Sequence, residues 1–285
     1  MIISDEKFIR SQIKPRKKDS YKGDFGKVLI YAGSVGMAGA AVLCARAALR
    51  SGAGLVRLLL PSMDSRLLDI FQVSVPEATC VAFHEGMELS DYDAIAAGPG
   101  LGRGKEASSI LEYILADHSG ALVLDADALN MISGSERLQE IFRSKSPRAV
   151  ITPHVGEALR LLGKDSACGR IKTATEREAA VISLIEKYRC TVLLKGHDTL
   201  IGNGSELFVN TTGGPGMATG GSGDVLTGII AALCAQGHDT LHAALIGAYI
   251  HGLAGDMAAG ELGEIGMISS DIIRYLPQAF KNCAK

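Results

Sequence analysis

Hydrophobic residues follow two patterns along the chain. Short unbroken apolar runs alternate with longer stretches in which apolar residues recur every three or four positions. The apolar runs are residues 27–32, 55–60, 79–83, 93–97, 121–124, 149–152 and 192–194. Unbroken runs are typical of strands buried on both faces of a parallel sheet, and the longer stretches are typical of the helices that cover it. The pattern therefore predicts an α/β fold with a mostly parallel central sheet.

Helices and one hairpin complete this outline. Helical periodicity covers residues 40–50, 110–115, 224–236, 241–259 and 268–280. Two apolar segments flank Gly202-Asn203-Gly204 and predict a hairpin over residues 200–210, near a sheet edge. Residues 1–20 contain a basic run at 14–18 and are interpreted as an arm or short helix with solvated charges. Residues 21–285 are interpreted as one domain.

The composition narrows the classes of function. The chain has 285 residues, 47% of them hydrophobic, with a formal net charge of −2 and a pI near 6.4. Broad binding surfaces for nucleic acid or anionic membranes carry a basic excess, which this chain lacks. The first residues contain no apolar segment of a secretory signal, and no run reaches the length of a membrane span. We therefore expect a cytoplasmic protein with neither nucleic acid nor membrane as a partner.

The cysteines are scattered without C-x-x-C spacing. They are Cys44, Cys80, Cys168, Cys190, Cys234 and Cys283. This distribution favours reduced, buried thiols over a metal site or disulfide bonds.

Glycine dominates residues 213–223, directly before an apolar helix. A segment so rich in glycine costs backbone entropy, and its use is to let main-chain N–H groups close around a ligand. The helix that follows has apolar residues at helical spacing from Val225 and ends at Gly237. Its N-terminus offers unpaired N–H groups and the positive end of the helix dipole. The combination predicts an anion-binding loop.

Asp224 follows this loop and has two interpretations. An acidic residue in the first turn stabilises the helix dipole, which is a structural role. Phosphoryl transfer, however, needs donors for the transferring group and a base for the attacking hydroxyl, and the loop with Asp224 offers both. The residues alone leave both interpretations open.

Polar and glycine clusters follow the ends of the predicted strands. They are Gly98-Pro99-Gly100-Leu101-Gly102; Asp125, Asp127 and Asn130; Pro153, His154, Gly156 and Glu157; and Lys195, Gly196 and Thr199. Ligands of parallel sheets bind beyond the carboxyl ends of the strands. Neither the P-loop sequence nor G-x-G-x-x-G is present, so the loop before Asp224 and the nearby Lys195 are the candidate phosphate site.

Several of these residues also have a purely structural interpretation. His154 is consistent with a residue that starts a helix. Asp125 and Asp127 are consistent with residues that order a strand exit and cap the next segment, and Asn130 with a supporting residue. No role follows from the residues themselves for His197, His242 and His251.

Certain segments resemble the ADP- or ATP-dependent NAD(P)H-hydrate dehydratases of the ribokinase-like superfamily. They are residues 213–228 (GGPGMATGGSGDVLTG), 98–102 (GPGLG), 124–130 (LDADALN), 152–157 (TPHVGE) and Lys195-Gly196. GSGD alone is shared with ribokinase-like kinases in general, whereas its combination with PGMAT and TPHxGE is specific to the dehydratase. The resemblance runs from about residue 26 to the last helix. It implies a ribokinase-like three-layer α/β/α sandwich.

The resemblance implies a repair reaction on (6S)-NADHX and (6S)-NADPHX, which are hydrated NADH and NADPH with a hydroxyl at C6 of the nicotinamide ring. A phosphoryl group from ADP or ATP activates that hydroxyl. Phosphate then leaves, driven by the ring nitrogen's lone pair, and NADH or NADPH is restored. Mg²⁺ is the implied cofactor.

The resemblance also implies roles for individual residues. Asp224 would be the base, and the N–H groups of Gly221, Ser222 and Gly223 would stabilise charge on the phosphoryl group. The positions matching hydrate contacts are Ala40, Gly102, His154 and Asp224. The positions matching nucleotide contacts are Lys195, Gly196, His197, Asp198, Thr199 and Gly223. Glu157 resembles the superfamily glutamate that organises magnesium, through water.

Partners and rival functions follow from the same comparison. Many relatives carry an N-terminal epimerase domain that twenty residues do not encode, so we expect the epimerase on a separate polypeptide. The alanine-rich residues 241–259 suit packing either within the domain or between subunits, and we expect a homo-oligomer, with a tetramer as one form. The main alternative is a ribokinase-like kinase for a vitamin-precursor alcohol of the hydroxyethylthiazole or hydroxymethylpyrimidine type. A nucleotide-binding sensor without turnover is a third class, but it would not need Asp224 beside a phosphate loop.

Overall fold

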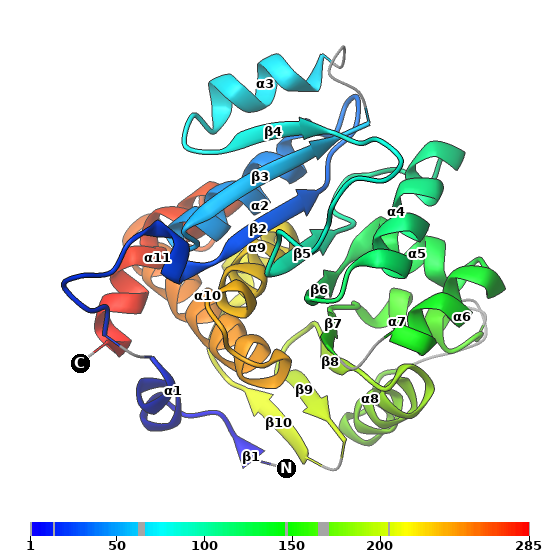
Figure 1. Cartoon of the computed structure of the whole chain (residues 1–285). Coiled ribbons are helices and arrows are strands. Elements are labelled where there is room, and N and C mark those ends of the chain that lie inside the picture. Colours follow the sequence, from blue (N-terminus) through cyan, green and yellow to red (C-terminus); the bar gives the residue numbers. More distant parts are fainter. Residues whose placement is uncertain are drawn as a thin grey trace.

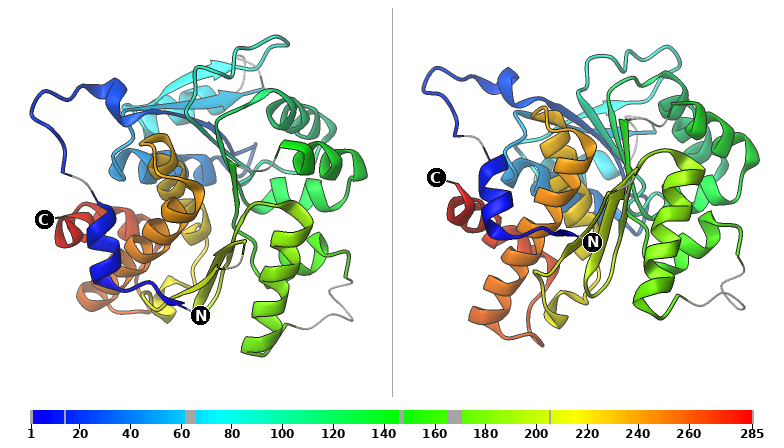
Figure 2. Two further views of the ribbon diagram at one scale, coloured as in Figure 1. Left: turned by 60° about the horizontal axis from the view of Figure 1, so that its bottom comes forward. Right: turned by 90° about the horizontal axis from the view of Figure 1, so that it is seen from below.

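The fold has three layers, with a central sheet between two layers of helices (Figure 1). A computed structural model describes residues 2–13, 15–61, 66–145, 148–164, 171–204 and 206–284, so Lys14 and Cys168 lie outside the described residues. Seen from below, the sheet stands edge-on between the two helical layers (Figure 2). The predicted α/β/α class is confirmed.

The described strands form one sheet in the order β1-β10-β9-β8-β7-β6-β5-β2-β3-β4. The strands are β1 (Ile2–Ile3), β2 (Lys27–Tyr31), β3 (Leu55–Leu60), β4 (Thr79–Ala82), β5 (Ala94–Ala97), β6 (Ala121–Leu124), β7 (Ala149–Ile151), β8 (Thr191–Leu194), β9 (Thr199–Asn203) and β10 (Glu206–Asn210). Among them only β9 runs antiparallel to its neighbours, because it belongs to the hairpin with β10. In the parallel part, Val28 pairs with Val56 on one side and Ala94 on the other.

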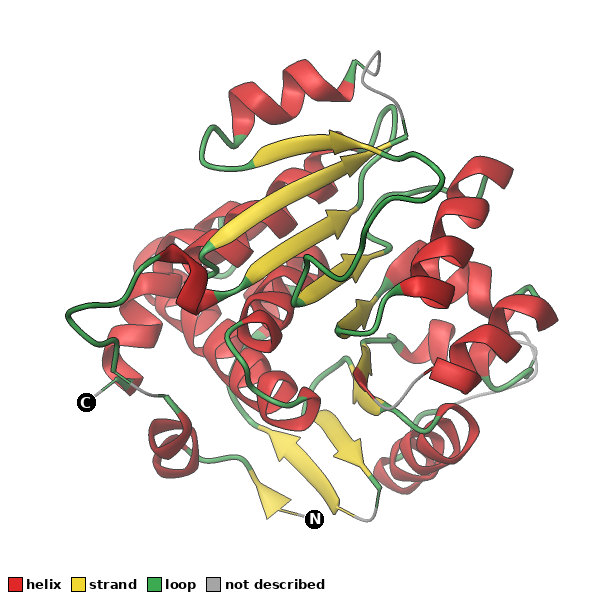
Figure 3. Cartoon of the chain, in the orientation of Figure 1, coloured by secondary structure: helices red, strands yellow, loops and turns green. Residues whose placement is uncertain are grey.

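Alternate strand residues point into two separate hydrophobic cores. In β2, Val28 and Ile30 face one core, and Leu29 and Tyr31 face the other. The first core is covered by α2 (Ala38–Arg50), α3 (Leu67–Ser74), α9 (Ser222–Ala235), α10 (Thr240–Leu262) and α11 (Ser269–Cys283). The second is covered by α4 (Lys105–Asp117), α5 (Ala126–Ser133), α6 (Glu136–Lys145), α7 (Val155–Leu161) and α8 (Ala174–Tyr188). Both faces of the sheet are therefore buried, which is why its strands read as unbroken apolar runs. Figure 3 shows the same arrangement by secondary structure.

Helix α9 lies against α2 at very short distance. A Cβ on Gly228 would stand 2.1 Å from the carbonyl oxygen of Cys44 and 3.0 Å from Ala47 Cβ, so only glycine fits there. From Val225 to Ala235 every residue of α9 is buried. This helix, whose N-terminus carries the predicted anion loop, is thus fixed in the core along its length.

Residues 2–13 and 15–25 join the body of the fold at several places, and Arg16 of the predicted solvated run donates to Gly52 O. Strand β1 pairs parallel with β10, and α1 (Glu6–Gln12) buries Ile9 completely in the first core. Asp5 accepts a hydrogen bond from Phe8 N–H and caps α1. A short 3₁₀ helix, η1 (Lys22–Phe25), leads into β2. In the part of the chain that the structure describes, no helix is both long and apolar enough to span a bilayer.

The structure fixes the start of helix α9, which the sequence predicts near Asp224. Helix α9 begins at Ser222 and not at Asp224, because Gly221 takes the N-cap position with φ of 93°. A Cβ on Gly221 would also stand 2.4 Å from Leu43 Cδ1. Ser222, Gly223 and Asp224 therefore form the first turn of the helix.

Candidate active site

The predicted clusters gather beyond the carboxyl ends of the parallel strands. The strands β2, β5, β6, β7 and β8 are parallel, so their carboxyl ends open in the same direction. Gly98 follows β5, Asp125 follows β6, His154 lies just after β7, and Lys195 follows β8. Lys195 N–H also donates to Pro153 O (2.9 Å), which joins the loops after β7 and β8. This confirms the placement that the sequence predicted.

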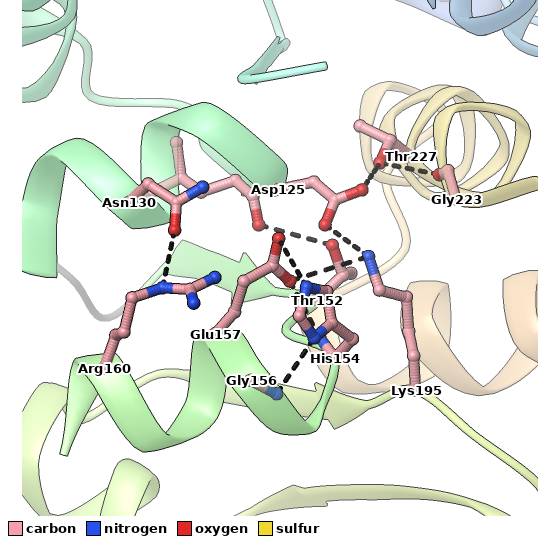
Figure 4. A network of polar contacts seen from close by, with 11 residues as sticks. Asp125, Asn130, Thr152, His154, Gly156, Glu157, Arg160, Lys195, Gly223 and Thr227 are labelled. Carbon is pink, nitrogen blue, oxygen red and sulfur yellow. Dashed lines mark hydrogen bonds and ion pairs between the residues drawn. The ribbon is translucent and has the colours of Figure 1, made fainter. Parts of the chain in front are cut away.

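Lys195 is paired with buried carboxylates. Its Nζ lies 2.6 Å from Asp125 Oδ1 and 4.0 Å from Glu157 Oε2 (Figure 4). Burial alone lowers the pKa of this amine, but the charges of Asp125 and Glu157 outweigh burial and raise it. Lys195 therefore stays positively charged within the site.

Asp125 connects Lys195 to helix α9. Its Oδ2 accepts a hydrogen bond from Thr227 Oγ1 at 3.1 Å, and the same hydroxyl lies 3.0 Å from Gly223 O. Asp125 stands at the N-cap of α5, but its side chain makes no cap hydrogen bond. The interpretation of Asp125 as a cap was therefore wrong: the carboxylate turns from α5 towards the ammonium group, because a charge this deeply buried needs a counter-ion.

Asp127 points elsewhere and holds a different loop. Its Oδ2 accepts a hydrogen bond from Gly102 N–H at 2.9 Å. In this loop a Cβ on Gly100 would stand 2.8 Å from Ala40 Cβ, so Ala40 and the 98–102 loop lie side by side. Gly100 and Gly102 both have positive φ, at 62° and 73°. Ala40 and Gly102, two of the four residues that the resemblance assigns to the hydrate, therefore lie in neighbouring segments.

His154 and Glu157 form the start of α7. His154 is the N-cap, its Nδ1 accepts from Gly156 N–H (2.9 Å), and Glu157 Oε2 accepts from His154 N–H (2.8 Å). The structural interpretation of His154 as a helix-start residue is confirmed. Because Nδ1 accepts, the neutral ring carries its proton on Nε2, and its side chain is still about half exposed at 54%. Nε2 lies 3.5 Å from Glu157 Oε1, so both ring nitrogens have partners within the first turn of α7.

Two carboxyl groups in the site hold protons more tightly than usual. Burial, followed by the charge of Asp125, raises the pKa of Asp224 to about 6, although Lys195 acts in the opposite direction. Burial also raises the pKa of Glu157. Perturbed carboxyl groups beside a lysine and a helix N-terminus are a signature of functional sites.

Helix α10 packs directly against the glycine-rich loop. Asp256 Oδ2 accepts from Gly213 N–H at 2.9 Å. A Cβ on Gly252 would stand 2.2 Å from Thr212 Oγ1, and one on Gly255 would stand 2.3 Å from Met217 Sδ. The loop therefore lies directly on the helix backbone at these two glycines.

The segment after β8 is less enclosed. Gly196 has φ of 147°, and a Cβ there would stand 2.8 Å from Arg177 Nη1. Arg177 donates to Leu194 O and Asp198 O, and Thr199 Oγ1 donates to Gly196 O. The side chain of His197 is 93% exposed. No contact in the described structure joins His197 or Asp198 to the carboxylates around Lys195.

Some site residues escaped the sequence reasoning. The sequence motifs assign no separate role to Thr227 or to Arg160, whose Nε donates to Asn130 Oδ1 at 2.9 Å. The position of Thr227, four residues after Gly223 on one helix face, was the available signal.

Two other features lie outside the site. A cavity of about 820 Å³ lies at the opposite end of the sheet, between residues 13–25 and the C-terminal ends of α2, α9 and α11, and contains none of the predicted site residues. The described cysteines, Cys44, Cys80, Cys190, Cys234 and Cys283, are all free thiols. Within the described ranges no three metal-ligating side chains cluster into a metal site.

Comparisons with known proteins agree with this geometry. The chain is 37% identical to the bifunctional NAD(P)H-hydrate repair enzyme Nnr of Moorella thermoacetica over 285 residues, covering 96% of this chain and 52% of that protein. It is 38% identical to the ADP-dependent (S)-NAD(P)H-hydrate dehydratase of Neisseria meningitidis over 270 residues, covering 91% and 86%. The chain thus spans about half the length of the bifunctional relatives.

Solved structures share the fold. A ribokinase-like superfamily protein of Enterococcus faecalis has a TM-score of 0.85 and 32% identity, covering 98% of this chain and 95% of that one. The ADP/ATP-dependent NAD(P)H-hydrate dehydratase of Bacillus subtilis, co-crystallised with ATP and Mg²⁺, has a TM-score of 0.83 and 26% identity, covering 99% and 98%. The sequence model of one family, NAD(P)H-hydrate dehydratase, matches residues 28–278. The chain therefore belongs to the NAD(P)H-hydrate dehydratase family.

Proposed function

We propose that this protein uses ADP or ATP to dehydrate (6S)-NADHX and (6S)-NADPHX to NADH and NADPH in the cytoplasm. The observation that carries the proposal is the position of Asp224. This carboxylate lies in the first turn of α9, next to the N–H groups of Gly221, Ser222 and Gly223, with a pKa raised to about 6. A base with a pKa near the working pH, beside donors for a phosphoryl group, suits transfer to a hydroxyl.

The proposed reaction has two stages. In the first, the C6 hydroxyl oxygen attacks the terminal phosphorus, Asp224 takes the hydroxyl proton, and the bond to the departing nucleotide breaks. In the second, the ring nitrogen's lone pair expels inorganic phosphate from C6, and loss of a proton from C5 restores the double bond. Water is thereby removed overall from the hydrate, and one phosphoanhydride bond is consumed.

Lys195 supports the nucleotide end of this reaction. A Cβ on Gly223 would lie 3.3 Å from Lys195 Nζ, so the ammonium group stands directly beside the anion loop. We place the nucleotide along Lys195, Gly196, His197, Asp198, Thr199 and Gly223. The exposure of His197 favours contacts from the backbone of this segment over contacts from its imidazole.

The residues present suit Mg²⁺ bound through water. Mg²⁺ prefers oxygen ligands and keeps much of its hydration, using one or two carboxylates together with substrate phosphates. Glu157 and Asp125 offer two buried carboxylates on the nucleotide side of the site. Bound there through water, the ion would neutralise charge on the phosphates.

The hydrate end of the site is assigned to Ala40, Gly102, His154 and Asp224. Support comes from the close approach of Ala40 to the 98–102 loop and from the half-exposed side chain of His154. We also propose that a separate epimerase supplies the (6S) epimer and that the protein is a homo-oligomer, such as a tetramer.

The test is a combined assay with hydrated NADH, Mg²⁺ and either ADP or ATP. Absorbance of regenerated NADH and release of phosphate are followed together, and the proposal expects equal amounts of both. A stable phosphoester without NADH would instead identify a kinase for an alcohol, which a panel of hydroxyethylthiazole and hydroxymethylpyrimidine substrates would then define. Binding of nucleotide without any turnover would identify a sensor.

A further inference from the structure

His251 is a buried histidine on α10 that contacts the end of the anion loop and has no role in the reaction described above. His251 lies on α10, in the helix face that supports the loop, and is only 8% exposed. Its Nε2 lies 3.4 Å from Ser222 Oγ. Ser222 is the first residue of α9, next to the N-cap Gly221, so it lies at the end of the anion loop.

The ring is neutral under ordinary conditions. The pKa of His251 is lowered to about 4, first by burial; a hydrogen bond with the backbone of Ser222 acts against this shift, and the charge of Lys195 acts with it. A neutral imidazole carries one proton, and the nitrogen that holds it decides what Ser222 can do. The two tautomers therefore have different consequences for an anion in the loop.

If Nδ1 carried the proton, Nε2 would accept the hydroxyl proton of Ser222. That proton would then point into the core, and a lone pair of Oγ would face the bound phosphoryl group. If Nε2 carries the proton, it donates to Oγ and leaves the hydroxyl proton to donate to the anion. Only in the second arrangement does the Ser222 hydroxyl donate a hydrogen bond to a negatively charged ligand.

We propose that His251 is a positioning residue whose Nε2–H orients the Ser222 hydroxyl as an additional donor to the transferring phosphoryl group. The helix that carries it is well placed for this role, because Asp256 on the same helix holds Gly213, near the start of the loop. His251 and Asp256 thus fix two ends of one loop from one helix. The inference rests on the proposed function only in naming the ligand as a transferring phosphoryl group; the contact between His251 and Ser222 does not depend on it.

The first test measures the tautomer without any substrate. Long-range ¹H–¹⁵N spectra of the whole protein, with ring nitrogens labelled, distinguish an Nε2–H from an Nδ1–H imidazole, and the spectrum of His251→Gln assigns the signal. We expect an Nε2–H ring that stays neutral from pH 8 to about 5, and the Nε2 resonance is expected to move in Ser222→Ala. An Nδ1–H tautomer would overturn the inference.

The second test is a double-mutant cycle in the phosphate-release assay. His251→Leu and Ser222→Ala are each expected to lower kcat by about 3- to 10-fold, the effect of one hydrogen bond, with little change in KM for the hydrate. The double variant should be no slower than either single variant, and His251→Gln, which keeps a donor, should recover part of the rate. Additive losses would mean that His251 only packs in the core.

Controls separate this inference from the proposed function. His242→Leu places the same substitution on the same helix, where His242 pairs with Asp239 away from the loop, and should leave kcat unchanged. If no variant, including the unmodified protein, turned over the hydrate, the proposed function would fail, and the tautomer measurement would still decide the role of His251.

Discussion

Lys195 Nζ and Asp125 Oδ1 form an ion pair 2.6 Å long between two loops of the site, and both side chains are largely withdrawn from water. The residues are separated by 70 positions along the chain. The pair therefore joins the ends of β6 and β8 across the intervening β7.

Replacing Asp125 with alanine should destabilise the fold. The variant leaves a buried ammonium group whose next carboxylate, Glu157, is 4.0 Å away. Removing one partner of a buried pair costs about 3–5 kcal/mol, which urea unfolding would measure. Glu112→Ala breaks an exposed pair with Arg137 and should change the free energy of unfolding by less than about 1 kcal/mol. Equal losses in the two variants would contradict this ranking.

The pH dependence of the reaction should report Asp224. A base must be deprotonated, and burial, then the charge of Asp125, raises the pKa of Asp224 to about 6. We therefore expect kcat/KM to fall as pH decreases through about 6 and to level off above it. His251, with a pKa of about 4, titrates too low to produce this limb. A profile that stays flat between pH 5 and 8 would remove Asp224 as the base.

Asp224→Asn tests the same residue directly. Asparagine keeps the size of the side chain and removes its basicity, so turnover should fall by roughly 10²-fold or more. Nucleotide binding, measured by calorimetry, should be retained. Near-normal turnover would show that Asp224 only starts the helix.

Gly223→Ala should separate activity from stability. The added Cβ would stand 3.3 Å from Lys195 Nζ and 3.4 Å from Asp125 Oδ2, so it fills space beside the anion loop without a severe clash. We expect at least a tenfold loss of activity, corresponding to about 1.4 kcal/mol of the barrier, with little change in melting temperature. Gly228→Ala is the matched control, because its Cβ would meet Cys44 O at 2.1 Å and should lower the melting temperature.

His154 combines a cap with a proposed substrate contact, and two substitutions should separate them. Asparagine is a good N-cap, so His154→Asn should preserve stability and raise KM for the hydrate. His154→Ala should raise KM equally and also cost about 1 kcal/mol in urea unfolding, because the cap is lost. An unchanged KM in both variants would leave His154 with the cap alone.

The strands, and the location of the site beyond their carboxyl ends, could be predicted because burial leaves a pattern of apolar residues along the sequence. Runs such as Ala94–Ala97 are apolar on both faces, and whatever follows them must lie at a carboxyl end. The glycine loop before α9 could also be predicted, because a segment so rich in glycine is best explained by main-chain N–H groups that close around a ligand.

Partnerships between distant residues left no such pattern. The interpretation of Asp125 as a residue that orders a strand exit and caps the next segment uses only its neighbours along the chain, whereas its partners are Lys195 after β8 and Thr227 on α9. For His251 the sequence shows only a histidine in an apolar helix, because its contact with Ser222 depends on how α10 packs against the loop. These contacts depend on how elements pack, which hydrophobic periodicity does not encode.

The short strand β1 has a consequence for solubility. Without it, β10 would form an open sheet edge, with unpaired N–H and C=O groups that could pair with another chain. Ile2 and Ile3 occupy that ladder beside Phe208 and Val209, and Ser4 N–H donates to Val209 O. Residues 2–4 thus cover part of the β10 edge with a strand of only two residues, and so short an outermost strand offers little backbone for pairing with another chain.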